Sequence, residues 1–118
     1  MNTSNNSLEK LSKRIAEFSK DRDWEQYHNP KNLSMALSIE SSELMEIFQW
    51  LTNEQAQLEN LSHNQIQTAR DEIADVMIYT IRIAQVLNIN LLDAIDKKIE
   101  LNSKKYPIEK IEGKPSPK

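Results

Sequence analysis

The sequence predicts an all-α protein, and three observations support this fold class. Its 118 residues include a single glycine, Gly113, and a shortage of glycine favours helix. The same shortage means that the chain offers no glycine-rich loop for binding phosphate. Leucine, isoleucine, glutamate, glutamine and lysine are abundant and β-branched runs are few, which favours helix over strand. Apolar residues recur three and four positions apart, the spacing of a helix with one buried face. We therefore expect four helices in a bundle-like arrangement.

The first half of the chain is expected to form two helices joined by an aromatic connector. Ser7 is suited to cap the first helix, which would end near residues 20–22. Its apolar stripe consists of Leu8, Leu11, Ile15 and Phe18. Residues 23–30 are expected to form a loop or bent connector. Pro30 suits the entry to a second helix, expected over residues 32–51.

The second half of the chain is expected to form two further helices. Residues 52–63 are polar and link to a third helix over residues 64–87, with room for a short helical turn on the way. Residues 73–87 are apolar on almost every side, which predicts burial on most faces. Asn90 can cap a fourth helix, expected over residues 91–104 and ended by the Tyr-Pro pair that follows.

These elements predict one domain over residues 1–107 and a flexible tail over residues 108–118. Residues 1–6 are polar and are expected to be disordered. A core of this size is small, which favours self-association.

The composition excludes several classes of protein. A net charge of −3 and a pI near 5.4 give no basic surface of the kind that binds nucleic-acid polymers. The absence of cysteine excludes disulfides and thiolate chemistry. The polar N-terminal segment and the lack of an apolar run of about 18 residues predict a soluble cytoplasmic protein without a membrane span.

Two acidic pairs carry most of the functional information. Glu40 and Glu43 are three residues apart, as are Glu72 and Asp75, so each pair shares one face of its helix. Antiparallel packing of the second and third helices would bring the pairs face to face. Carboxylates embedded in apolar sequence require a counter-charge, and an all-oxygen set suits Mg²⁺ before Ca²⁺. We therefore expect a magnesium site, although a single acidic pair is more often solvated.

Other metal chemistry is disfavoured by the histidines. A di-iron carboxylate bundle requires Glu-x-x-His motifs, and neither His28 nor His63 stands three residues after a glutamate. Zinc is disfavoured by the same shortage of nitrogen and sulfur ligands. His28 is expected to be a structural hydrogen-bonding residue rather than a catalyst.

Aromatic and basic side chains supply candidate substrate contacts. Trp24, in the connector, and Trp50, at a helix end, can belong to the core or an interface, or can stack on a nucleobase for about 1–3 kcal/mol. Lys98 and Asn102 lie one helical turn apart. They can belong to a solvated face, or can contact a phosphate and a sugar or base.

Several short segments occur in a specific order along the chain: residues 22–28, 30–33, 40–46, 48–50, 71–76, 98–102 and 105–107. Together they resemble the MazG-like all-α nucleoside triphosphate pyrophosphohydrolases, and in particular their dCTP pyrophosphatase-type branch. The resemblance covers residues 8–107. It implies a MazG-type fold and Mg²⁺-dependent hydrolysis between the α- and β-phosphates of a (deoxy)nucleoside triphosphate, giving the monophosphate and pyrophosphate. It also implies assembly as a homodimer or homotetramer.

The resemblance assigns roles to individual residues. Mg²⁺ would be held by Glu40, Glu43, Glu72 and Asp75. Catalysis would use Glu40 or Glu43 to position and deprotonate the attacking water. The remaining assigned residues are Trp24 and Trp50 at the base, and Tyr79, Lys98 and Asn102 at phosphate or nucleoside.

The chain departs from the family pattern at several positions. Ser41 replaces the second glutamate of the general pattern, and Ser42 replaces a small Gly or Ala. Ile15 stands where some dCTP-type members carry a histidine, which bears on base specificity. A different class stays open: a non-catalytic helical dimerisation module that binds nucleotides in a regulatory role.

Overall fold

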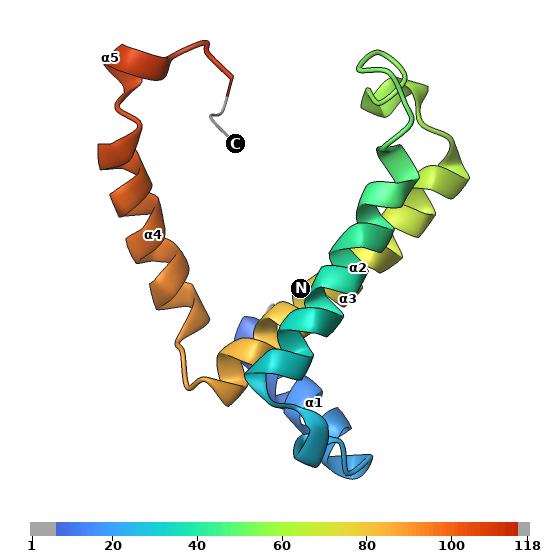
Figure 1. The fold of residues 1–118 in the computed structure, drawn as a ribbon, viewed down its shortest axis with the longest axis vertical. Helices are drawn as coiled ribbons and strands as arrows, with labels where there is room; N and C mark the ends of the chain where they lie inside the picture. The colour runs from blue at the N-terminus through green and yellow to red at the C-terminus, as the bar shows by residue number, and fades with distance from the viewer. Residues whose placement is uncertain (1–6, 116–118) are drawn as a thin grey trace. The chain divides into compact units, whose positions relative to one another are not determined.

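The computed structural model describes residues 7–115, and over that range it contains helices and no strand (Figure 1). The predicted all-α fold is confirmed. The elements are α1 (Leu8–Asp21), η2 (Glu25–Tyr27), α2 (Pro30–Phe48), η3 (Leu58–Asn60), α3 (His63–Val86), α4 (Leu91–Lys105) and α5 (Ile108–Ile111). The expected disorder of residues 1–6 lies outside the described residues.

The chain divides into two compact units, Met1–Asn88 and Ile89–Lys118. We describe each unit by itself. The predicted domain boundary after residue 107 stays a prediction.

Helix α1 begins where the sequence predicts. The hydroxyl of Ser7 accepts a hydrogen bond from the backbone N–H of Lys10 at 3.2 Å, which caps the helix. The helix ends at Asp21, and Asp23 adopts a positive φ of 55°. The backbone N–H of Trp24 then donates to the carbonyl of Ser19 at 2.9 Å, so the connector folds back onto the end of α1.

Helix α2 is shorter at its C-terminus and starts earlier than predicted. The side chain of Asn29 accepts a hydrogen bond from the N–H of Asn32 at 2.8 Å, so Asn29 is the cap and Pro30 occupies the first turn. The helix ends at Phe48 rather than near residue 51. Thr52 and Gln55 then exchange side chain to backbone hydrogen bonds of 2.9 and 3.1 Å, which stabilise a separate turn.

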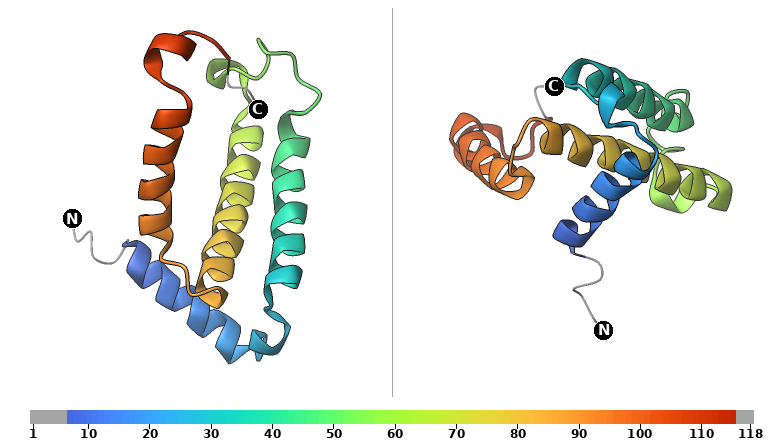
Figure 2. Two further views of the ribbon diagram at one scale, coloured as in Figure 1. Left: turned by 60° about the vertical axis from the view of Figure 1, so that its left-hand side comes forward. Right: turned by 90° about the horizontal axis from the view of Figure 1, so that it is seen from below.

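Helix α3 starts with a reciprocal cap. The Ser62 hydroxyl accepts from the N–H of Gln65 at 3.0 Å, and the Gln65 side chain accepts from the N–H of Ser62 at 2.8 Å. Helices α2 and α3 contact each other along their lengths, and α1 packs on α3. The figures show α2 and α3 side by side and antiparallel, with α1 across the end where α2 begins and α3 finishes (Figures 1 and 2). This pairing brings the two acidic pairs onto facing helices.

The core of the first unit is small. Leu33 is 1% exposed, and Ala69, Ile81 and Ala84 are also buried. Residues 79–86 of α3 are buried or half-buried, as predicted. Burial on most faces is wrong for the preceding turns, where Ile73, Met77 and Ile78 are exposed, because α1 and α2 cover only part of the α3 surface. Within residues 7–115 no helix has both the length and the apolar character needed to cross a membrane.

The second unit contains α4 and α5. The side chain of Asn90 caps α4 by accepting from the N–H of Asp93 at 3.0 Å, as predicted. The helix continues to Lys105, one residue beyond the predicted end. Helix α5 is a single turn, Ile108–Ile111, in the stretch expected to be a tail. The flexibility of that stretch stays a prediction.

Candidate metal and nucleotide site

Three of the four predicted metal ligands come together between α2 and α3. Glu40 and Glu43 on α2 and Glu72 on α3 each offer a carboxylate oxygen, and these oxygens lie within 4.8 Å of one another. The i, i+3 spacing puts both α2 carboxylates on the face that meets α3. Carboxylates this close repel one another strongly unless a cation or a shared proton compensates their charge.

The electrostatics of the cluster show how poorly its charge is compensated. Glu40 and Glu72 are half-buried, and one oxygen of each is shielded from solvent without a hydrogen-bond partner among the described residues. Burial, then the hydrogen bonding and charge of Glu43, then the charges of Asp75 and Glu72 raise the pKa of Glu40 to about 7. The pKa of Glu72 is also raised, first by burial and then by Glu43 and Asp75.

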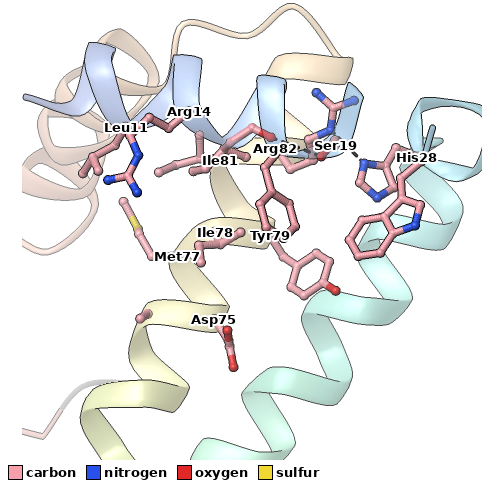
Figure 3. A pocket seen from close by; sticks show the side chains of 14 residues that line it. Leu11, Arg14, Ser19, His28, Asp75, Met77, Ile78, Tyr79, Ile81 and Arg82 are labelled. Carbon is pink, nitrogen blue, oxygen red and sulfur yellow. Dashed lines mark hydrogen bonds between the residues drawn. The ribbon is translucent and has the colours of Figure 1, made fainter. Parts of the chain in front are cut away.

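Asp75 lies beside the cluster, one helical turn after Glu72. Its oxygens are not part of the group within 4.8 Å. Its negative charge nevertheless lies near enough to raise the pKa of both Glu40 and Glu72. Asp75 also lines the cavity described below, so it connects the acidic cluster with that cavity (Figure 3).

The donor set fits a hard divalent cation. Its members offer oxygen ligands only, and two shielded oxygens have no other partner among residues 7–115. The ion pairs found in that range are Lys13–Glu9 and Lys97–Asp93, so no lysine or arginine is paired with the cluster. A bound Mg²⁺ or Ca²⁺ would satisfy these oxygens and lower the cost of holding them together.

A cavity of about 560 Å³ adjoins the cluster within the first unit. Helix α1 lines it with Leu11, Arg14, Ile15, Phe18 and Ser19, and the connector adds Trp24 and His28. Helix α3 completes it with Ala74, Asp75, Met77, Ile78, Tyr79, Ile81 and Arg82 (Figure 3). The lining is mostly apolar, with a few polar groups, as in sites that bind small organic ligands.

Trp24 is held in the cavity wall by aromatic neighbours. Its ring meets Phe18 edge-on, with centroids 5.7 Å apart and planes at 67°. The His28 ring lies 6.2 Å away at 52°. Trp24 remains 43% exposed, so part of its surface is open to a ligand.

Comparison with known proteins decides the family. Residues 35–115 match the model of the MazG-like family. The chain belongs to the MazG-like family. It is 37% identical to human dCTP pyrophosphatase 1 over 101 residues, which is 86% of this chain and 59% of that protein. It is 35% identical to bovine dCTP pyrophosphatase 1 over 107 residues, or 91% of this chain and 63% of that protein.

The MazG-like chain therefore spans about three-fifths of the length of these curated relatives. A solved structure gives a match over more of its own length. The crystal structure of a pyrophosphatase from Archaeoglobus fulgidus DSM 4304 is 41% identical, with a TM-score of 0.78 over 85% of this chain and 92% of that one. The predicted MazG-type fold is confirmed.

The MazG-like structure brings some predicted substrate residues together and leaves others apart. Trp24 and Tyr79 both line the cavity, beside Asp75. Trp50 follows the end of α2, is 86% exposed and does not line this cavity. Lys98 and Asn102 lie on α4, in the second unit, and their contacts with a substrate stay predictions.

The sequence did not single out the partner of His28. The Nε hydrogen of Arg82 is donated to Nδ1 of His28 at 2.8 Å, which agrees with the expected structural role of this histidine. The two residues are 54 positions apart, so no local periodicity connects them. An arginine inside an otherwise apolar helical segment was the available signal.

Proposed function

We propose that this MazG-like protein hydrolyses a (deoxy)nucleoside triphosphate, dCTP or a related pyrimidine deoxynucleotide, to the monophosphate and pyrophosphate. The observation that carries the proposal is the acidic cluster beside an apolar cavity with an aromatic wall. Such a pair of sites suits a triphosphate at the acids and a nucleoside in the cavity. The names of the relatives, dCTP pyrophosphatase 1 and a pyrophosphatase, support the same chemistry.

The proposed cofactor is Mg²⁺, held by Glu40, Glu43, Glu72 and Asp75. When bound, it neutralises charge on the triphosphate oxygens and on the departing pyrophosphate. Glu40 or Glu43 orients the attacking water and accepts its proton, because both carboxylates reach into the space between α2 and α3. No covalent intermediate is needed.

The nucleoside is proposed to lie in the cavity against Trp24 and Tyr79. Ile15 in the α1 wall makes that wall apolar where a histidine would offer a hydrogen bond. Trp50, Lys98 and Asn102 are proposed as further contacts to base, phosphate or sugar. Lys98 would add a fixed positive charge near the phosphates.

Self-association is part of the proposal. Ile73, Met77 and Ile78 expose apolar surface on α3 in the single chain, and the buried core is small. A homodimer or homotetramer would cover this surface. The cytoplasmic location expected from the sequence stays a prediction.

The experiment is to incubate the purified protein with Mg²⁺ and a panel of nucleoside triphosphates. We expect equal amounts of monophosphate and pyrophosphate, fastest with a pyrimidine deoxynucleotide, and no product in EDTA. Release of orthophosphate would instead indicate attack at the terminal phosphate. Nucleotide binding without any product would favour the non-catalytic regulatory module.

A further inference from the structure

We propose that Arg82 is a positioning residue for the nucleotide: by bonding to His28, it holds Trp24 in the wall of the cavity. Arg82 acts through other side chains and sets nucleoside affinity rather than turnover. This role rests on the proposed function, because Trp24 is the side chain assigned there to the nucleoside.

Arg82 is the hub of a hydrogen-bond network that joins three segments of the first unit. It is only 9% exposed. Its Nε donates to Nδ1 of His28 at 2.8 Å, and its Nη1 donates to Oε1 of Gln85 at 3.0 Å. Gln85 in turn donates to the carbonyl of Ser12 at 2.6 Å. The network therefore ties α3 to the connector and to α1. Figure 3 shows the Arg82–His28 part of it, beside the cavity.

His28 transmits this restraint to Trp24. The two rings lie 6.2 Å apart at 52°, on the same connector. Backbone bonds from Trp24 to Ser19 and from Tyr27 to Trp24, both 2.9 Å, fix its main chain but leave its ring free to rotate. With Trp24 43% exposed, its ring orientation depends on its neighbours Phe18 and His28.

The bond requires His28 to be neutral, with Nδ1 as an acceptor. The charged groups that act on His28 are Arg82 on α3 and Glu25 in η2. Burial, and then the Arg82 charge, lower the pKa of His28, while Glu25 opposes them. The imidazole is therefore neutral near pH 7 and carries its proton on Nε2.

The choice of arginine is informative. Burying a guanidinium costs free energy, and Arg82 has no carboxylate ion-pair partner among residues 7–115. A residue that only filled space could be apolar. The rigid fork of arginine can reach His28 and Gln85 together, which the single ammonium of lysine cannot do with the same geometry.

The test is steady-state hydrolysis of dCTP by Arg82→Lys and Arg82→Gln. We expect KM to rise about tenfold, the scale of a weakened base–aromatic stack, with kcat changed less than about twofold. Arg70→Lys is the matched control, since Arg70 is an exposed arginine on the same helix, and it should leave both constants unchanged. Equal KM values for Arg82→Lys and wild type would overturn the assignment.

A double-mutant cycle with His28→Gln distinguishes positioning from simple bracing of the fold. If Arg82 acts through His28, Arg82→Lys adds no further rise in KM to a His28→Gln protein. If the rises in KM from Arg82→Lys and His28→Gln instead multiply in the double variant, Arg82 acts independently of His28 and the proposal is overturned. Should the Arg82 variants fail to fold, His28→Gln alone decides: we expect the same rise in KM, and an unchanged KM overturns the proposal.

A spectroscopic readout follows Trp24 directly. In a Trp50→Phe protein, Trp24 is the sole tryptophan, because the chain has two. Its emission should titrate with His28 below pH 6.5, and Arg82→Gln should move that midpoint upward. An unmoved midpoint overturns the Arg82–His28 link. Wild type without hydrolysis of any nucleotide overturns the proposed function instead, and the role of Arg82 with it.

Discussion

Glu40 shows how strongly a single side chain responds to the cluster. Its pKa of about 7 in the structure stands well above the value of 4.5 that applies to an unfolded chain. The folded protein therefore binds an extra proton between these values. The stabilisation from this proton is fully present below pH 4.5 and is lost as the pH rises through 7.

We therefore expect Glu40→Gln to stabilise the metal-free protein increasingly as the pH rises from 4.5 to above 7. The measurement is the melting temperature of both proteins in EDTA across this range. The pKa of His28 is lowered, so this residue destabilises the fold as the pH falls below 6.5, which is opposite to the trend from Glu40. Because His28 is present in both proteins, its effect cancels in the comparison. With saturating Mg²⁺ the advantage of Glu40→Gln should disappear or reverse. A melting difference independent of pH would contradict the raised pKa.

Loss of a ligand charge should abolish hydrolysis while leaving the fold intact. Glu43→Gln and Asp75→Asn keep the shape of each side chain and remove its charge. We expect kcat/KM for dCTP to fall by about 100-fold or more, since loss of one electrostatic group at a phosphoryl site has that scale. Circular dichroism checks that helix content is kept. Glu46→Gln, an exposed glutamate on the same α2 helix, serves as the control and should stay active.

The sequence predicts which residues lie close together where the helical repeat alone determines their positions. The pairs Glu40–Glu43 and Glu72–Asp75 share faces because of the 3.6-residue period, and antiparallel packing then makes them neighbours. Arg82 and His28 could not be paired in this way. Their contact depends on how the connector folds over the end of α3, which no local pattern encodes.

At the scale of the elements, helix starts were easier to predict than helix ends. Ser7 and Asn90 cap their helices as expected, because side-chain caps are local in sequence. The α2 cap is Asn29, three residues before the predicted start, because Pro30 can occupy the first turn. The predicted end of α2 was too late in the sequence, since the residues after Phe48 have helix-forming side chains. In the structure they leave the helix, and the Thr52–Gln55 hydrogen bonds stabilise a separate turn.

The junction of α2 with its neighbours depends on Leu33, the one large side chain among residues 7–115 that is less than 2% exposed. We expect Leu33→Ala to lower the free energy of unfolding by about 2–5 kcal/mol, because it leaves a cavity in a small core. Urea unfolding followed by circular dichroism measures the change. Met35→Ala on the same helix is the control: Met35 is 58% exposed, and we expect a change below about 1 kcal/mol. Equal losses in the two variants would show that α2 packs differently.

For the whole molecule, the sequence-based prediction overestimated how much apolar surface a single copy of the chain buries. Residues 73–87 are apolar on almost every side, and this pattern predicted that the segment is buried on most faces. The structure covers Ile81 and Ala84 but leaves Ile73, Met77 and Ile78 exposed. Periodicity identifies a face that is apolar, yet it cannot tell whether the same chain or another copy covers that face.

We therefore expect the protein to sediment as a dimer or tetramer of its 13.7 kDa chain. Ile73→Glu should shift the mass toward the monomer, because an exposed apolar side chain, 55% accessible in the single chain, becomes charged where a second copy would pack. Gln67→Glu adds the same charge to an exposed polar position of α3 and should leave the assembly intact. Analytical ultracentrifugation over a range of concentrations measures both. A wild-type protein that stays monomeric throughout would refute the assembly and leave the apolar α3 surface to another partner.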